Sequence, residues 1–210
     1  MSILLCIFVA KKNKGTIMKR TILAVLCCLF GMLVGAQETK MYLVTDNPIA
    51  YDNSQFYLGW SSHPIPGYYI QEYFVKGESP EGFNRMFTIC LYDTDITPEE
   101  GVKQKIDELE KRKKSDRLCN YQMYNKGDEY ILDFLVSNAS DGNLSVAEWN
   151  LYYYKKVKIG LKSYLRLSFF SKRAYGDDII SFLKAIPDLR GERIIELSEM
   201  NLKIKAISQQ

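Results

Sequence analysis

The sequence contains a single histidine, His63, and lacks the common motifs of enzyme active sites. His63 lies in the segment Ser-Ser-His-Pro-Ile-Pro, which predicts a rigid turn. No Gly-x-Ser-x-Gly elbow accompanies it, so a serine or cysteine hydrolase is not indicated. The sequence also has no glycine-rich phosphate loop and no dinucleotide fingerprint. We therefore expect no catalytic residues, no bound metal and no cofactor.

Charged residues are missing from the apolar segment between Thr21 and Ala36. This segment follows the basic start Met18-Lys-Arg and ends in the small residues Gly35 and Ala36, which is typical of a secretory signal peptide. It is shorter than the roughly 20 residues that a spanning helix needs. We predict that residues 1–36 are an upstream extension and a signal peptide cleaved after Ala36. An uncleaved anchor is the alternative.

An excess of positive charge is also missing once this segment is removed. The first 36 residues contain five of the 28 basic residues and none of the 25 acidic ones, which leaves 23 against 25. Nucleic-acid binding normally needs a basic surface, so no nucleic-acid partner is expected. After cleavage we expect no membrane span and a location in the periplasm or outside the cell.

Only two cysteines, Cys90 and Cys119, follow the predicted cleavage site. In an oxidising compartment they could form a disulfide. The alternative is two buried thiols in or beside strands. Sequence alone does not show whether the two residues approach each other closely enough to pair.

Composition divides the remaining chain into three stretches. Residues 37–66 are polar and rich in turn signals, so they are expected to form a leader or linker. Residues 67–190 are expected to form the folded domain. Residues 191–210 show no consistent period and are expected to be a C-terminal extension.

Two helices are expected within the domain. Thr97-Pro98-Glu99-Glu100 is a capping box with proline at the first helical position, and it predicts a helix to about Lys114. The second helix is expected to follow Asp177 and to stop at Pro187.

Alternating apolar residues predict two strands followed by two hairpins. The predicted strands are 68–76, 83–92, 119–125, 128–137, 148–158 and 162–171. The first hairpin is expected to turn at Lys126-Gly127, which pairs Met123 with Tyr130. The second is expected to have a three-residue turn at 159–161, because that register gathers apolar residues on one face. The fold class is therefore α+β, with an antiparallel β-sheet covered by two helices.

A known fold shares this order of elements. The blocks Gln71-Glu-Tyr-Phe-Val-Lys-Gly-Glu, Phe83-Asn-Arg-Met-Phe-Thr-Ile and Pro98-Glu-Glu resemble the PsbP-like fold over about Tyr68 to Ile186. That fold is named for an extrinsic protein of photosystem II and includes small exported bacterial proteins. The resemblance implies a non-catalytic binding or assembly module, and it assigns no site residue.

Tyrosine offers the clearest candidate for binding, since all 15 tyrosines follow residue 36. The expected register of the second hairpin places tyrosines and basic residues on one face. This candidate binding face consists of Tyr152, Tyr154, Lys156, Tyr164 and Arg166. Aromatic rings with hydroxyl groups suit glycan and protein surfaces, and the basic groups favour an anionic partner. The alternative is that a helix or the C-terminal tail covers this face.

Together these features predict an exported, non-catalytic binding or assembly module with a protein or glycan surface as its partner. One alternative is a secreted hydrolase acting on glycans or peptides through carboxylates such as Asp93, Asp95, Glu129 and Asp133. Another is a protective or inhibitory partner of a secreted protein.

Overall fold

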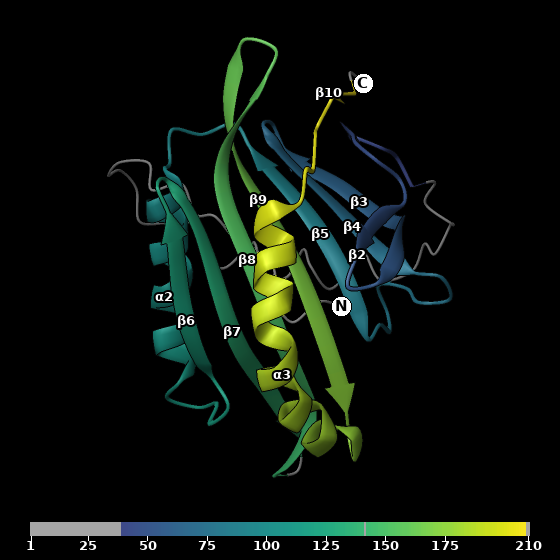
Figure 1. Cartoon of the computed structure of the whole chain (residues 1–210), viewed down its shortest axis with the longest axis vertical. Coiled ribbons are helices and arrows are strands. Elements are labelled where there is room, and N and C mark those ends of the chain that lie inside the picture. The colour runs from purple at the N-terminus through teal and green to yellow at the C-terminus, as the bar shows by residue number, and fades with distance from the viewer. Residues whose placement is uncertain (1–38, 141, 209–210) are drawn as a thin grey trace, which may run out of the picture. The chain divides into compact units, whose positions relative to one another are not determined.

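An antiparallel sheet is the main element of the protein, as seen in a computed structural model (Figure 1). The structure describes residues 39–140 and 142–208, so the predicted signal peptide lies outside the described residues. The strands are β1 (Leu43–Val44), β2 (Ile49–Tyr51), β3 (Ser54–Ile65), β4 (Tyr68–Val75), β5 (Arg85–Tyr92), β6 (Asn120–Lys126), β7 (Glu129–Ser140), β8 (Asn143–Ile159), β9 (Lys162–Tyr175) and β10 (Ala206–Ile207). The helices are α2 (Pro98–Arg112) and α3 (Asp178–Glu199). Eight of these strands form one sheet in the order β2-β3-β4-β5-β9-β8-β7-β6, and β1 pairs with β10.

The long β8–β9 hairpin lies near the middle of this sheet and turns at Gly160-Leu161. Ile159 pairs with Lys162, and Tyr152 pairs with Phe169. Gly160 has a φ of 60°, a conformation that glycine adopts without strain in tight hairpin turns. The expected three-residue turn is therefore wrong by one position. Because side chains alternate along a strand, that shift moves the residues of one strand to the opposite face.

The β6–β7 hairpin turns at Gly127-Asp128 and differs from the expected register by two positions. Lys126 pairs with Glu129, and Met123 pairs with Leu132 instead of Tyr130. A shift of two keeps every side chain on its face, so the expected grouping of Tyr121 and Met123 with Leu132 survives.

The two helices cover opposite faces of the sheet. The capping box of α2 forms as expected: Glu100 N donates to Thr97 Oγ1 (3.2 Å), and Thr97 N donates to the Glu100 carboxylate (2.8 Å). Helix α2 lies on the face that carries Tyr154 and Leu165, and α3 lies on the face that carries Trp149 (Figure 1). The expected antiparallel sheet with two covering helices is confirmed at this level.

Helix α3 continues through Pro187 to Glu199, so the expected stop at Pro187 is wrong. Proline lacks an N–H and cannot donate to the carbonyl four residues earlier. Apolar residues before and after it, Ile186 and Leu197, are nevertheless buried in the main core. Their burial against the sheet stabilises the helix on both sides of Pro187 despite the lost hydrogen bond.

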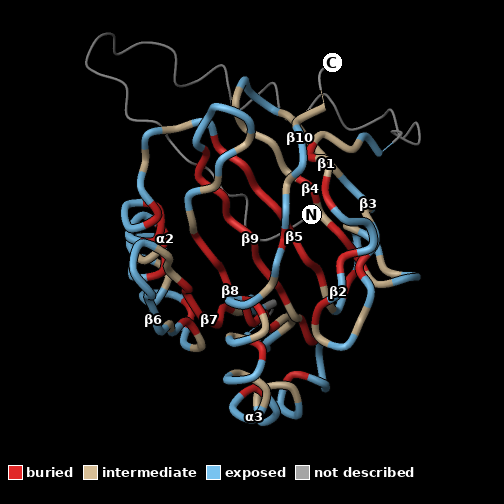
Figure 2. The backbone as a smooth tube through the Cα atoms, turned by 45° about the horizontal axis from the view of Figure 1, so that its top comes forward, coloured by how far each residue is buried: buried red, intermediate tan, exposed pale blue. Residues whose placement is uncertain are grey.

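The main core lies between the sheet and α3, and buried segments run through the central strands (Figure 2). It is rich in aromatic residues. The rings of Tyr51 and Phe170 lie 4.9 Å apart, and those of Trp149 and Phe170 lie 6.2 Å apart in an edge-on arrangement. Such tilted pairs are favourable geometries for aromatic side chains.

The expected leader and C-terminal extension are both part of this fold. Strands β2 and β3 lie within 37–66, and their turn at Asp52-Asn53 has φ values of 49° and 52°. Leu43 of β1 pairs with Ile207 of β10, which joins the two ends of the described chain. The turn signals in residues 37–66 therefore correspond to tight turns and bulges of paired strands, not to a linker. Among the described residues, no helix has the length and apolar composition of a membrane span.

Candidate functional site

The structure separates the five residues of the predicted binding face. Tyr152, Tyr154 and Lys156 lie on the α2 side of the sheet, whereas Tyr164 and Arg166 lie on the α3 side. Four of the five are buried, and only Lys156 is exposed. The exposed aromatic face does not form, because the hairpin register differs by one residue from the expected one.

The buried tyrosines of this set pack beneath α2. A Cβ added to Gly101 of that helix would lie 3.3 Å from Tyr154 Cδ1, so glycine permits this close approach. Lys105 Nζ lies 5.8 Å from the centre of the Tyr152 ring. Lys156 donates a hydrogen bond of 2.8 Å to the carbonyl oxygen of Thr94. These contacts stabilise the helix on the sheet.

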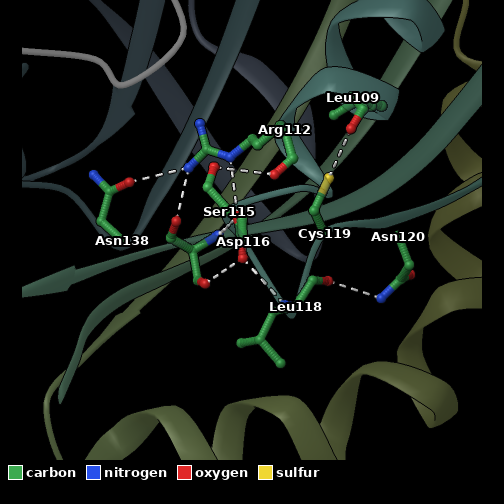
Figure 3. A network of polar contacts seen from close by, with 9 residues as sticks. Leu109, Arg112, Ser115, Asp116, Leu118, Cys119, Asn120 and Asn138 are labelled. Carbon is green, nitrogen blue, oxygen red and sulfur yellow. Dashed lines mark hydrogen bonds and ion pairs between the residues drawn. The ribbon is translucent and has the colours of Figure 1, made fainter. Parts of the chain in front are cut away.

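Cys90 and Cys119 do not form a disulfide. Cys90 lies in β5 and Cys119 immediately precedes β6, and three strands separate β5 from β6. Cys119 Sγ lies 3.5 Å from the carbonyl oxygen of Leu109 in α2, as Figure 3 shows. Its role is packing at the end of the helix.

The same region contains a polar network around Asp116 (Figure 3). Its carboxylate accepts hydrogen bonds from Ser137 N and Oγ (2.6 Å each) and pairs with Arg112 Nε (2.9 Å). Burial opposes ionisation of Asp116, but the bonds from Ser137 and Arg112 outweigh it and lower the pKa. The network joins the end of α2 to β7 and is structural.

His63 stacks on an aromatic ring. Its imidazole lies 4.2 Å from the Tyr69 ring in nearly parallel planes, and Nδ1 hydrogen-bonds to the carbonyl oxygen of Tyr68 (2.8 Å). Among the described residues, no group of three or more histidine, cysteine or acidic side chains is arranged to hold a metal.

A groove lies on the α3 side of the sheet, between the end of the β8–β9 hairpin and the tail that follows α3. We call it the basic groove, because the charged residues along it are Lys155, Lys158, Arg166, Lys203 and Lys205. The side chain of Lys158 alternates with those of Val157 and Ile159 and lies on the α2 side of the sheet, so the basic side chains of the groove are the other four. No acidic residue lines it. Its volume is about 370 Å³, within the range of small-molecule sites. Lys155 pairs with Glu129 (3.1 Å) and Lys205 pairs with Asp46 (3.0 Å). The groove therefore retains a surplus of positive charge.

Arg166 is the buried member of the basic groove, with 2% of its surface exposed. Its Nη1 donates to the carbonyl oxygen of Leu202 (2.6 Å), and its Nε has no hydrogen-bond partner within the described part of the chain. Burial lowers the pKa of this guanidinium to about 10, although Tyr153 and Glu129 act in the opposite direction. It is therefore a buried cation at neutral pH, and such groups are stabilised by an anion.

A second hollow, which we call the carboxylate cavity, lies between the β6–β7 turn, β8 and α3. Its volume is about 690 Å³. The aromatic and charged residues that line it are Tyr124, Tyr153, Asp128, Glu129, Glu199 and Lys126. Burial opposes ionisation of Glu129, but hydrogen bonds with Tyr153 and Lys155 lower its pKa, so it is ionised at neutral pH.

The basic groove and the carboxylate cavity share a wall. Glu129 of the cavity forms an ion pair with Lys155 of the groove and accepts a short hydrogen bond from the Tyr153 hydroxyl. The Tyr153 ring lies 5.3 Å from Lys155 Nζ and 6.0 Å from Arg166 Cζ. The two hollows together form the candidate site.

Sequence reasoning identified two members of this site, Arg166 and Glu129, but placed them in different hypothetical sites. It missed Lys203 and Lys205, which lie in the tail treated as an extension. The sequence signal for this tail is the alternation of apolar Leu202 and Ile204 with basic Lys203 and Lys205, because an alternating segment packs along another element. The residues before it do not alternate, so the segment as a whole is ambiguous.

A protein-family model matches residues 43–202 of the chain. The match covers most of the chain and includes all the residues that line the carboxylate cavity. Neither a curated protein nor a solved structure matches the chain.

Proposed function

We propose a binding function for this chain, which belongs to the family whose model matches residues 43–202. It is an exported, non-catalytic binding module, and its ligand carries an anionic group that enters the basic groove. The observation that carries this proposal is Arg166: a buried guanidinium with an unsatisfied Nε, in a groove that also holds the side chains of three lysines and no acid.

Two further features support the proposal. The apolar segment that ends at Ala36 is typical of a signal peptide, which supports export. The resemblance to the PsbP-like fold supports a binding or assembly module. Intact-mass measurement of secreted protein tests export: we expect a chain that begins at Gln37, and a chain that retains residues 18–36 would contradict it.

The binding test is a calorimetric titration of the protein with inorganic phosphate at low ionic strength. The variant Lys203→Ala/Lys205→Ala removes the two exposed lysines that the tail contributes to the groove. We expect it to weaken phosphate binding about tenfold, which corresponds to about 1.4 kcal/mol.

The matched control is Lys111→Ala/Lys114→Ala, which removes two exposed lysines at the end of α2. We expect this control to bind phosphate like the wild type. Equal losses in both double variants would mean that phosphate responds only to net charge, and the proposal would be wrong.

The carboxylate cavity favours a second candidate function, hydrolysis of a glycosidic bond. Glycosidases use a pair of carboxyl groups, and Asp128, Glu129 and Glu199 line one cavity. The lowered pKa of Glu129 suits a carboxylate nucleophile or base, not the acid that protonates a leaving group. Turnover of chromogenic glycosides that is lost in Glu129→Gln would favour this candidate over a binding module.

A further inference from the structure

We propose that the ligand is an anionic sugar that spans both hollows, with its acidic group in the basic groove and its hydroxylated ring in the carboxylate cavity. This inference rests on the proposed anion-binding function and names the class of ligand. It is carried by the contrast in charge between two hollows that share a wall.

The two hollows are adjacent along the wall that they share. Lys155 and Glu129 are only 3.1 Å apart, yet Lys155 lines the groove and Glu129 lines the cavity. The Tyr153 ring, which lines the cavity, lies 6.0 Å from the buried guanidinium of Arg166. A molecule the size of a monosaccharide or disaccharide that contacts Arg166 therefore extends toward Tyr153.

The charges of the two hollows select a ligand that is anionic at one end only. The groove has four basic side chains and no acid, whereas the cavity has three carboxylates and one lysine. A second negative charge would meet Asp128, Glu129 or Glu199, and like charges repel at close range. This arrangement disfavours polyanions and acidic peptides, whose charges are spread along the chain.

The polar groups of the cavity match hydroxyl groups. Ionised carboxylates only accept hydrogen bonds, and each sugar hydroxyl can donate one. Asn125 and Ser198, which also line the cavity, can both donate and accept.

The apolar groups of the cavity match the C–H groups on the faces of a sugar ring. Ile131 and Ile194 line the cavity beside the rings of Tyr124 and Tyr153. A sugar ring presents C–H groups on its faces and hydroxyl groups at its edge. This mixture of carboxylates, amide, rings and aliphatic groups therefore fits a pyranose better than a purely apolar ligand.

The acidic group of the sugar can be a carboxylate or a phosphate, since a guanidinium binds both in the same fork geometry. The experiment therefore compares glucuronate, glucose 6-phosphate, glucose and inorganic phosphate by calorimetry on the mature chain. We expect at least one anionic sugar to bind about tenfold more tightly than both glucose and phosphate. Whichever anionic sugar binds more tightly identifies the acidic group.

Two variants separate the hollows. Tyr124→Ala removes a ring from the cavity, and we expect it to weaken binding of the anionic sugar about fivefold while phosphate binding is unchanged. The control is Tyr57→Ala, which removes a tyrosine of similar exposure in β3 and should change neither ligand. Lys203→Ala/Lys205→Ala should weaken both ligands.

The outcomes distinguish this inference from the proposed function. Phosphate and both anionic sugars could bind equally and respond only to the groove variant. The chain would then bind anions, but the inference that its ligand is a sugar would be wrong. If a tetra-glutamate peptide binds more tightly than every sugar, the partner is an acidic protein segment and the inference is overturned. If no anion binds, the proposed function itself fails.

Discussion

Arg166 and Leu202 join the C-terminal tail to the central hairpin: Arg166 Nη1 donates a hydrogen bond of 2.6 Å to the carbonyl oxygen of Leu202. The bond fixes one wall of the basic groove relative to the other. Leu202 is itself buried in the main core, so its side chain and its carbonyl hold the same segment in place.

We predict that Leu202→Ala destabilises the protein by about 2 kcal/mol, because it removes a buried side chain and leaves a cavity. It should also speed amide hydrogen exchange in the tail, since β10 depends on this anchor to pair with β1. Chemical denaturation and hydrogen exchange measure the two effects. The control is Ile65→Ala, at a position 58% exposed, which should change neither.

The capping box of α2 gives a second prediction. Thr97→Ala removes the acceptor for Glu100 N, and we expect a loss of about 1 kcal/mol in the free energy of unfolding. Glu99→Ala removes only an exposed ion pair with Lys103 and should cost less than half as much. If the two variants are equally stable in urea denaturation, the capping box contributes nothing beyond a surface charge.

The ion pair between buried Asp133 and half-buried Arg190 attaches α3 to the sheet. Trp149 Nε1 donates to Asp133 (2.8 Å), and Arg190 Nε lies 2.8 Å from the other carboxylate oxygen. Burial raises the pKa of Asp133, although Trp149 and Arg190 oppose this effect. Arg190→Ala leaves the buried carboxylate without its cation and should cost about 3 kcal/mol.

The double variant Arg190→Ala/Asp133→Asn tests this reason. An amide oxygen can still accept from Trp149, and no buried charge remains, so the double variant should be more stable than Arg190→Ala alone. A double variant that is less stable than either single variant would show that packing, not charge, explains the loss.

Asp116 gives a prediction about pH. Its pKa is lowered in the folded protein, so its contribution to stability is present above the pKa of the unfolded chain and is lost as the pH falls through the folded value. Asp116→Asn should therefore cost about 1–3 kcal/mol at neutral pH, because hydrogen bonds to a charged acceptor are lost. The difference from the wild type should shrink in acid, as denaturation at a series of pH values would show. A difference that stays constant would contradict the assignment.

Local signals predicted the elements of this fold better than their pairing. The capping box at Thr97 specifies a helix start without help from distant residues, and it forms as expected. Strand register depends on the turn, and the two hairpins show the consequence. A shift of two at Gly127 kept the faces intact, whereas a shift of one at Gly160 exchanged them and dissolved the predicted binding face.

The ends of the domain could not be predicted from local signals. Pro187 normally ends a helix, but burial of Ile186 and Leu197 on the sheet outweighs the lost hydrogen bond. Strand β1 finds its partner 164 positions away, where Leu43 pairs with Ile207, and no periodic pattern shows such a contact. The basic groove depends on that same tail, so the alternation of Leu202 and Ile204 with Lys203 and Lys205 could indicate a packed segment but not the hairpin beside which it lies.

The most direct test of the account is the nuclear magnetic resonance signal of the Arg166 Nε–H group during titration with inorganic phosphate. This group has no hydrogen-bond partner among the described residues and lies in the groove that the anion is proposed to enter. We predict that its signal shifts progressively and saturates, and that Lys203→Ala/Lys205→Ala moves the midpoint to about tenfold higher phosphate. An Arg166 signal that does not move while other signals do would place the anion elsewhere and contradict the proposed function.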